Sequence, residues 1–227
     1  MRVLVACEFS GRVRDAFLKR GHDAVSCDLL PTEVPGPHIQ DDVLNHLNDG
    51  WDMMIAHPPC TYLANSGVSH LYNKDKTINH ERWQKMVDAG KFFQKLWLCN
   101  IPKICMENPI MHKYGKAEAG ISFYYDTIEF RQVIQPWMFG HMEQKATCLW
   151  LKNLPKLAPT NNVRDQMMEL PDNKRQRLHY LPPSKDRQTI RSRTFPGIAE
   201  AMAAQWGRGA GEQKESREQE TGVSEGW

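Results

Sequence analysis

Residues 51–63, WDMMIAHPPCTYL, decide how this chain folds. Residues 52–56 form an apolar run of strand length. The triplet 57–59, HPP, ends that run, because proline donates no hydrogen bond to a sheet and holds the residue before it in an extended conformation. Cys60 is therefore expected just past the carboxyl end of a buried strand, where open α/β sheets bind their ligands. The alternative is a buried structural cysteine, since free cysteines are among the most buried residues.

The composition is that of an ordinary single-domain protein. The chain has 227 residues, 41% of them hydrophobic and 25% charged, which is enough to bury a real core. Its net charge of +2 gives no global signal for nucleic acid, so such binding requires a local basic patch. No apolar run reaches membrane-spanning length, and the N-terminus lacks the pattern of a signal peptide.

The cysteines indicate the compartment and argue against a metal. Six cysteines are scattered without CxxC or Cys/His spacing. The lack of such spacing argues against a zinc site and against a disulfide framework, and it favours a reducing, cytoplasmic location.

The N-terminal segment predicts a β-loop-α-β unit. A strand at 2–7 is followed by the turn 8–11 (EFSG), a helix at 13–20 and a second strand at 23–27, with Asp28 at its end. The small turn lets the backbone approach a ligand, and Asp28 is placed to accept hydrogen bonds from ribose hydroxyls. Because there is no GxGxxG motif, the unit suits an adenosine-containing ligand without a phosphate cradle.

Further carboxylates lie near predicted strand ends. Asp41 or Asp42 either reaches an adenine amino group or caps the short helix or turn that follows. Glu107 comes directly after a buried strand at 103–106, which itself follows a long helix at 79–99. Glu107 is either a reactive acid or a solvated loop acid.

The C-terminal half predicts a sheet edge and an insert. Strands at 131–137 and 147–151 form an antiparallel hairpin. Residues 152–183 are polar, basic and irregular, and they are either a nucleic-acid-facing insert or a solvated surface. An alanine-rich helix follows at 198–206, and the composition after it predicts a disordered tail at 207–227.

A thiol, a carboxyl group and an adenosine site are consistent with one reaction. A thiolate that adds to C6 of a pyrimidine makes C5 nucleophilic. A carboxylic acid beside N3 of cytosine lowers the barrier by hydrogen-bonding the ring as charge moves into it. C5 can then take a methyl group from a sulfonium donor. Cys60, Glu107 and Asp28 suit these three parts.

The chain resembles the DNA (cytosine-5) methyltransferases, and among them the small, phage-type members, over roughly residues 1–207. The family's Pro-Pro-Cys nucleophile motif is matched at residues 55–60 (IAHPPC), and its Glu-Asn motif at Glu107-Asn108. These two motifs, in this order and each after a strand, are the specific part. The Phe-Ser-Gly turn, the Phe-Gly turn followed by Lys145, and the C-terminal Pro-Gly are weaker matches.

The resemblance implies a Rossmann-like α/β methyltransferase fold, with a mostly parallel sheet, an antiparallel edge hairpin and a reduced or absent target-recognition domain. It implies DNA as the partner, S-adenosyl-L-methionine as the cofactor, no metal, and a role in phage or restriction–modification DNA modification. The site residues that it implies are catalytic Cys60, Glu107, Asn108 and Lys145; cofactor-binding Phe9, Ser10, Gly11, Asp28, Asp42, Pro58 and Gly197; and DNA-binding Pro59, Arg191 and Arg193.

The expected organisation has four parts. These are a catalytic and donor-binding domain at 1–151, a basic irregular insert at 152–188, a C-terminal helix at 189–207 that completes the donor pocket, and a disordered tail at 208–227.

The sequence also departs from the family pattern, which leaves alternatives open. Thr61 stands where the family has Gln, and residues 56–57 (AH) stand where it has Gly-Gly. One alternative is a related C5-pyrimidine transferase with a modified sulfonium donor or a non-duplex substrate, in which Lys145 and His57 recognise an extra carboxylate. Another is a non-enzymatic Rossmann-like binding protein that keeps the donor pocket.

Overall fold

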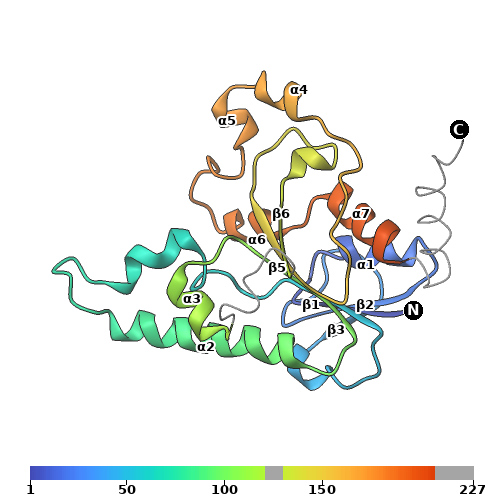
Figure 1. Cartoon of the computed structure of the whole chain (residues 1–227), viewed down its shortest axis with the longest axis horizontal. Helices are drawn as coiled ribbons and strands as arrows, with labels where there is room; N and C mark the ends of the chain where they lie inside the picture. The colour runs from blue at the N-terminus through green and yellow to red at the C-terminus, as the bar shows by residue number, and fades with distance from the viewer. Residues whose placement is uncertain (121–129, 208–227) are drawn as a thin grey trace, which may run out of the picture.

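The chain is arranged around one sheet (Figure 1), and the computed structural model describes residues 1–120 and 130–207. The predicted tail at 208–227 lies outside the described residues. The strands are β1 (Arg2–Ala6), β2 (Asp23–Asp28), β3 (His38–Gln40), β4 (Met53–Ala56), β5 (Lys103–Asn108), β6 (Arg131–Ile134) and β7 (Thr147–Lys152). Their order across the sheet is β3-β2-β1-β4-β5-β7-β6.

The sheet is mostly parallel. β1 pairs in parallel with β2 and β4, β2 with β3, and β4 with β5, whereas β7 runs antiparallel to both β5 and β6. The predicted α/β class is confirmed, including the antiparallel hairpin at one edge. The strand order reverses between β1 and β4, and sheets of this kind bind ligands in the crevice beyond the carboxyl ends of their strands at that point.

Helices cover both faces of the sheet, because the central strands are apolar on both sides. The helices are α1 (Arg12–Leu18), α2 (His80–Leu98), α3 (Lys113–Glu118), α4 (Arg164–Met168), α5 (Asp172–Arg175), α6 (Arg187–Ser192) and α7 (Pro196–Trp206), with 3-10 turns η1 (Val43–Asn45), η2 (Asn65–Leu71) and η3 (Pro136–Met138). Val3 and Val5 pack in the core beneath α1 and α7, while Leu4 and Ala6 pack in the core beneath α2. Successive side chains of β1 therefore pack alternately into two separate cores, one on each face of the sheet.

Several boundaries differ from the sequence prediction. β5 continues through Asn108, so Glu107 belongs to the strand and not to a loop after it. The sequence predicts a loop at 115–123, but α3 occupies the first residues of that segment. Residues 121–123 of the segment lie outside the described part of the chain. Within 152–183, α4 and α5 are regular but only about one turn each, too short for a periodic pattern to predict.

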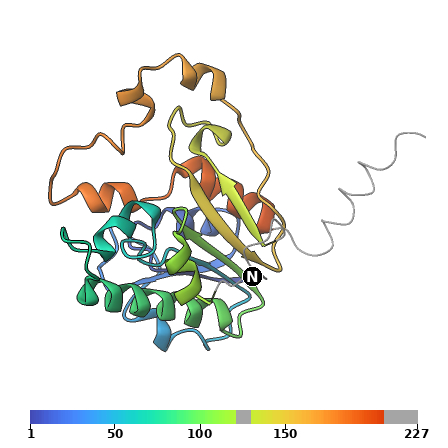
Figure 2. The ribbon, with the colours of Figure 1, turned by 60° about the vertical axis from the view of Figure 1, so that its left-hand side comes forward.

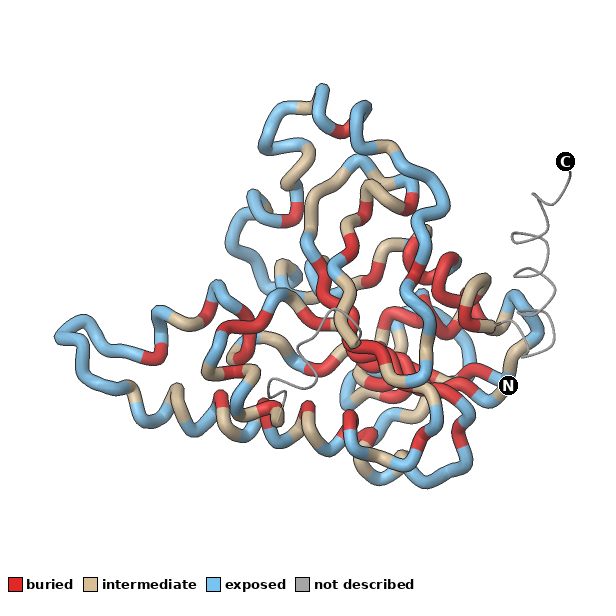
Figure 3. The backbone as a smooth tube through the Cα atoms, in the orientation of Figure 1, coloured by how far each residue is buried: buried red, intermediate tan, exposed pale blue. Residues whose placement is uncertain are grey.

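The segment that carries α4 and α5 projects away from the sheet, beyond the β6–β7 hairpin (Figures 1 and 2). Figure 3 shows it mostly exposed, in contrast to the buried strands. A few apolar side chains anchor it, chiefly Leu157, Met167 and Leu178. This extension returns to the sheet through α6, whose residues face the site described next. Among the described residues, no helix is both long and apolar enough to cross a membrane.

Candidate active site

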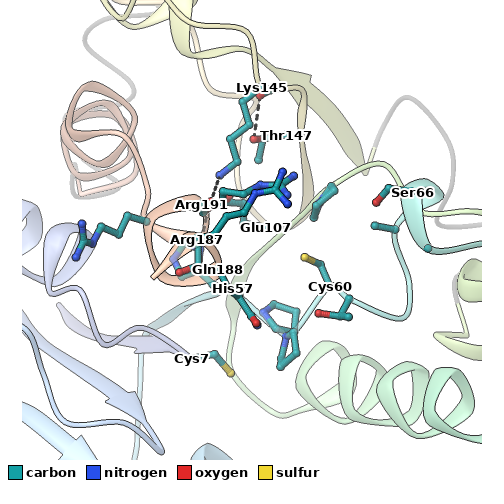
Figure 4. Close-up of a pocket in the computed structure, with 18 of the residues that line it drawn as sticks. Cys7, His57, Cys60, Ser66, Glu107, Lys145, Thr147, Arg187, Gln188 and Arg191 are labelled. Atoms are coloured by element: carbon teal, nitrogen blue, oxygen red, sulfur yellow. Dashed lines mark hydrogen bonds and ion pairs between the residues drawn. The ribbon is translucent and has the colours of Figure 1, made fainter. Parts of the chain in front are cut away.

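The turn after β4 carries Cys60 into a cavity. The N–H of His57 donates to the carbonyl of Ala6 at 2.9 Å, which extends the pairing with β1 one residue beyond β4. The Cys60 carbonyl then accepts from the N–H groups of Leu63 and Ala64, each at 3.0 Å, and this fixes the following turn. Cys60 is partly exposed and lines a cavity of about 710 Å³ (Figure 4). The thiol is therefore not sealed inside the core.

Glu107 reaches the same cavity from the neighbouring strand. β4 and β5 pair with Ala56 opposite Met106, so Glu107 lies one residue further along, level with His57. Its Oε2 lies 2.8 Å from Nδ1 of His57 and accepts a hydrogen bond from the hydroxyl of Thr194 at 3.3 Å. The thiol and this carboxyl group thus line one cavity from adjacent strand ends.

Asn108 supports the site from outside the cavity wall. Its side chain is buried, and its Nδ2 donates to the carbonyl of Pro58 at 3.4 Å. Its Oδ1 has no hydrogen-bond partner within the described residues. Asn108 therefore ties β5 to the turn that carries the thiol, and it does not line the cavity itself.

Basic side chains come to the cavity from two other segments. Lys145 lies on the loop before β7, and its Nζ donates to the carbonyl of Arg191 at 2.9 Å. Arg187, Gln188 and Arg191 lie on α6 and line the cavity as well (Figure 4). The resemblance implied a DNA-binding role for Arg191, and the fold places Arg191 on the same cavity as Cys60.

The carboxyl group and the imidazole form a buried pair. Burial acts to raise the pKa of Glu107, but His57, Lys145 and Thr194 outweigh it and lower that pKa to about 2. Burial likewise acts to lower the pKa of His57, but the adjacent carboxylate of Glu107 outweighs it and raises that pKa above its ordinary value. Glu107 is therefore ionised at neutral pH, and its negative charge favours the protonated form of His57.

The thiol of Cys60 is held in its protonated form. Burial raises its pKa, and the negative charge of Glu107 acts in the same direction. Lys145 and Arg191 lower the pKa without overcoming burial. Attack by this sulfur therefore requires loss of a proton, since the thiolate and not the thiol is the nucleophile.

The turn after β1 lines the cavity through Cys7, Glu8, Phe9 and Ser10. The side chain of Glu8 is buried, and its Oε1 accepts from the N–H of Val13 at 2.8 Å. A carboxylate thus occupies the N-terminus of α1, where many α/β folds bind a phosphate. An anionic phosphate would meet a like charge here, so this end of the cavity suits a ligand without one.

Gly11 shapes this turn and does not line the cavity. Its φ is +71°, a left-handed conformation that favours glycine. A Cβ at this position would come close to the guanidinium of Arg14 and to Val34. Gly11 is therefore required for the close approach of the turn to a buried arginine.

The two acids implied for the cofactor lie near the cavity but outside its wall. Oδ1 of Asp28 accepts from the N–H of Leu30 at 2.9 Å, and Oδ1 of Asp42 accepts from the N–H of Leu44 at 3.0 Å, so Asp42 caps η1. Burial and the charges of both acids raise the pKa of Cys7, which does line the cavity. Both carboxylates therefore act electrostatically on the part of the cavity that Cys7 lines.

The remaining implied residues divide between wall and scaffold. Pro58 and Pro59 line the cavity. Arg193 also lines it, but its guanidinium forms two hydrogen bonds with the carboxylate of Glu33, at 2.9 and 2.6 Å. Gly197 does not line the cavity. A Cβ there would lie 2.1 Å from the carbonyl of Phe139, so the lack of a side chain at Gly197 lets α7 pack against the turn at the end of η3.

Sequence reasoning missed part of the wall. Thr194, Arg187 and Gln188 line the cavity and were not assigned roles, and His57 was considered only as an alternative recognition group. The position of His57 directly before the two prolines was the available signal, because the adjacent strand end must lie beside it. No group of three His, Cys, Asp or Glu side chains within residues 1–120 and 130–207 could hold a metal ion.

Similarity to known proteins is found among solved structures. No protein-family profile and no curated protein matches the chain. Three solved structures are similar: a prophage-encoded E. coli protein described as a DNA modification methyltransferase (16% identity, TM-score 0.45), the Entamoeba histolytica methyltransferase EhMeth (14%, 0.44) and the S. pombe Dnmt2 methyltransferase (13%, 0.41).

These alignments are partial. They cover 76%, 71% and 82% of this chain, and 56%, 57% and 61% of those proteins, in the same order. The chain thus spans less than two thirds of each of them.

Proposed function

We propose that this protein is an S-adenosyl-L-methionine-dependent DNA cytosine-5 methyltransferase that acts through attack of Cys60 on C6 of the base. The observation that carries the proposal is the shared cavity. Cys60 and Glu107 line it from the ends of two neighbouring parallel strands, and the turn after β1 lines it as well. A nucleophile, an acid and a donor site are thus within one space of a size typical of ligand pockets.

The donor end of the cavity suits a sulfonium cation. Glu8 lines it, and Asp28 and Asp42 act on Cys7 beside it. Three carboxylates favour a positive charge, and Glu8 disfavours a phosphate at the start of α1. When bound, S-adenosyl-L-methionine would supply an electrophilic methyl group on a positively charged sulfur, with Asp28 and Asp42 as candidates to hold its adenosine.

The α6 side of the cavity suits a polyanion. Arg187 and Arg191 line it, and Lys145 lies against the α6 backbone. Cationic side chains grouped at one wall, in a chain of nearly neutral net charge, are a local basic patch of the kind that binds the phosphates of nucleic acid. We infer that the sugar-phosphate backbone next to the target base lies along α6.

The protein's own groups divide the chemistry. Cys60 must lose its proton before it attacks C6, and Lys145 and Arg191 favour the thiolate form. Glu107 lies beside the thiol with its carboxyl group available to the Watson–Crick edge of a cytosine. Because the target base has to leave a duplex to enter such a cavity, the two prolines before Cys60 keep the thiol placed while the base arrives.

The test uses labelled S-adenosyl-L-methionine, cytosine-containing DNA and purified protein. After digestion, mass analysis of the nucleosides should show 2′-deoxycytidine heavier by one methyl group at C5. DNA with 5-fluorocytosine at target sites should form a covalent adduct through Cys60, because fluorine at C5 blocks release. Cys60→Ser is the control and should give neither product. Modification of DNA at an unchanged rate by Cys60→Ser would contradict the proposal.

Two other functions are less well supported. A transferase for a carboxylate-bearing donor needs His57 or Lys145 free, but His57 contacts Glu107 and Lys145 donates to the Arg191 carbonyl. A non-enzymatic binding protein needs neither Cys60 nor Glu107. The mass analysis separates these cases directly, since a modified donor adds a heavier group and a binding protein adds none.

A further inference from the structure

The acid of the proposed reaction lacks a proton in the resting site. Cytosine N3 needs a proton when the thiolate adds to C6, and Glu107 is the carboxyl group placed to give it. The side chain of Glu107 is only 12% exposed, and its nearest charged neighbour is His57, at 2.8 Å. As an ionised carboxylate, Glu107 can accept hydrogen bonds but has no proton to donate.

His57 is built into the site as a partner of this carboxylate. Its backbone belongs to the extended pairing with Ala6, and Pro58 follows it, so the position of its ring is set by the sheet. The side chain is 11% exposed and lines the cavity. The separation of 2.8 Å is that of an ion pair, but the ring is not aligned with the carboxylate for a hydrogen bond of ordinary angle.

The second ring nitrogen of His57 also indicates that this histidine is a partner of Glu107. Nε2 of His57 is buried and has no hydrogen-bond partner in the described part of the chain. A purely structural buried histidine normally satisfies both nitrogens. This ring satisfies neither with full hydrogen-bond geometry, and its one close charged contact is with Glu107.

We propose that His57 is a positioning residue that holds the proton which Glu107 delivers to N3 of the bound cytosine. The inference rests on the proposed function, because that reaction supplies the cytosine. His57 acts through Glu107 and does not contact the base.

The transfer balances in atoms and charge. Cys60 gives its proton to solvent water, and its thiolate forms the S–C6 bond. The C5=C6 electron pair moves to C4–C5, and the C4=N3 pair moves to N3. N3 takes a proton from Glu107, and Glu107 takes one from Nδ1 of His57. The result is a neutral imidazole, a carboxylate and a protonated N3. C5 then bonds to the methyl group of the sulfonium donor as the donor's S–CH3 bond breaks. Solvent water takes the C5 proton, the C5–H electron pair re-forms C5=C6 as the Cys60 thiolate leaves, and the N3 proton returns through Glu107 to His57.

The surroundings of His57 favour this role. Glu107 and Glu8 favour its charged form, whereas burial and the positive charge of Lys145 oppose it. Thr194 donates to Oε2 of Glu107, the oxygen that also faces His57. We assign the other oxygen of this carboxylate, Oε1, to the base.

The first test needs no substrate. The ring signals of His57 are followed by NMR against pH in the ligand-free wild type and in Glu107→Gln, with His57→Asn used to assign them. We expect the titration midpoint of His57 to lie above that of an ordinary histidine and to fall in Glu107→Gln. The ring signals of the exposed His80, at the start of α2, serve as the internal reference for the chemical shifts. A midpoint unchanged by Glu107→Gln would overturn the inference.

The second test uses turnover. His57→Asn can still donate to Glu107 but carries no mobile proton. We expect kcat of His57→Asn to fall about 10²-fold, within the range of acid–base catalysis, with KM little changed. The wild type should lose activity as the pH rises through the pKa of His57, and His57→Asn should not show this loss. His80→Asn is the matched control and should match the wild type. A pH profile of His57→Asn parallel to that of the wild type would show a merely structural role and overturn the inference.

The two tests also separate this inference from the function on which it rests. If the wild type transfers no methyl group to any cytosine substrate, the proposed function fails while the NMR result still decides whether the pair holds the proton. If the wild type is active but His57 is neutral at pH 7, the inference fails and the function stands.

Discussion

The amide of Asn108 donates to the carbonyl of Pro58 at 3.4 Å and so fastens the end of β5 to the turn that carries Cys60. This contact adds to the β4–β5 pairing in joining the two halves of the candidate site, because Glu107 directly precedes Asn108. The relative position of the thiol and the carboxyl group therefore depends in part on a buried side chain that lines no part of the cavity.

Replacing Asn108 should loosen this connection. Asn108→Ala leaves the buried Pro58 carbonyl without its donor, which should lower the free energy of unfolding by about 1–3 kcal/mol. Urea denaturation measures this loss. Activity should fall while the donor still binds, because the turn after β1 is untouched. A stability equal to that of the wild type would show that the Pro58 carbonyl does not depend on this bond.

Removing the charge of Glu107 should slow turnover. Glu107→Gln keeps the size of the side chain but cannot transfer a proton, so we expect kcat to fall about 10²–10⁴-fold. Donor binding, measured by calorimetry, should be unchanged. Equal rates for Glu107→Gln and the wild type would rule out an acid role for this residue.

The reactivity of Cys60 should increase with pH. Because burial raises the pKa of this thiol, its alkylation by iodoacetamide should remain slow at neutral pH and accelerate at alkaline pH, beyond the range of an ordinary cysteine. Lys145→Ala should slow the reaction further, since it removes a charge that favours the thiolate. Peptide mass spectrometry distinguishes Cys60 from the other cysteines. Rapid labelling of Cys60 at neutral pH would contradict the expectation.

Acid should destabilise the wild type through Glu107. The folded-state pKa of Glu107 lies at about 2, below its ordinary value of 4.5. A depressed pKa contributes stability that is present above pH 4.5 and is lost as pH falls toward 2. The free energy of unfolding should therefore fall more steeply over this window in the wild type than in Glu107→Gln. Parallel curves for the two proteins would argue against the ion pair with His57.

Two glycines should respond differently to alanine. At Gly197 a Cβ would lie 2.1 Å from a backbone carbonyl, so Gly197→Ala forces α7 away from its neighbour and should cost at least about 1–3 kcal/mol. At Gly21, where φ is +76° and no atom lies within 4 Å, Gly21→Ala should cost only the left-handed strain of about 1–2 kcal/mol. Thermal unfolding compares them, and a Gly197→Ala protein at least as stable as Gly21→Ala would contradict this reasoning.

The sequence predicted those features that depend on local pattern. The apolar runs of β1, β4 and β5 are continuous because both of their faces are buried, and the periodic face of α2 is long enough to be unambiguous. Cys60 and Glu107 could be predicted to line one cavity because both lie at the carboxyl ends of parallel strands, and such strands end on the same edge of the sheet.

Features that depend on register or on distant segments could not be predicted in this way. The contact between His57 and Glu107 follows from Ala56 lying opposite Met106, a pairing that no local pattern encodes. The salt bridge of Arg193 with Glu33 joins residues 160 positions apart, and it uses a guanidinium that sequence position alone assigned to DNA. The short helices α3 to α6 form in segments without a periodic apolar face.

The walls of the cavity come from both ends of the chain, with residues 7–10 on one side and residues 183–194 on the other. A ribosome that has released β1 to β5 has already made the segments that carry Cys60 and Glu107, but it has not yet made α6. Until residues 183–194 emerge, that wall of the cavity is missing, so the cavity cannot be closed on this side early in synthesis.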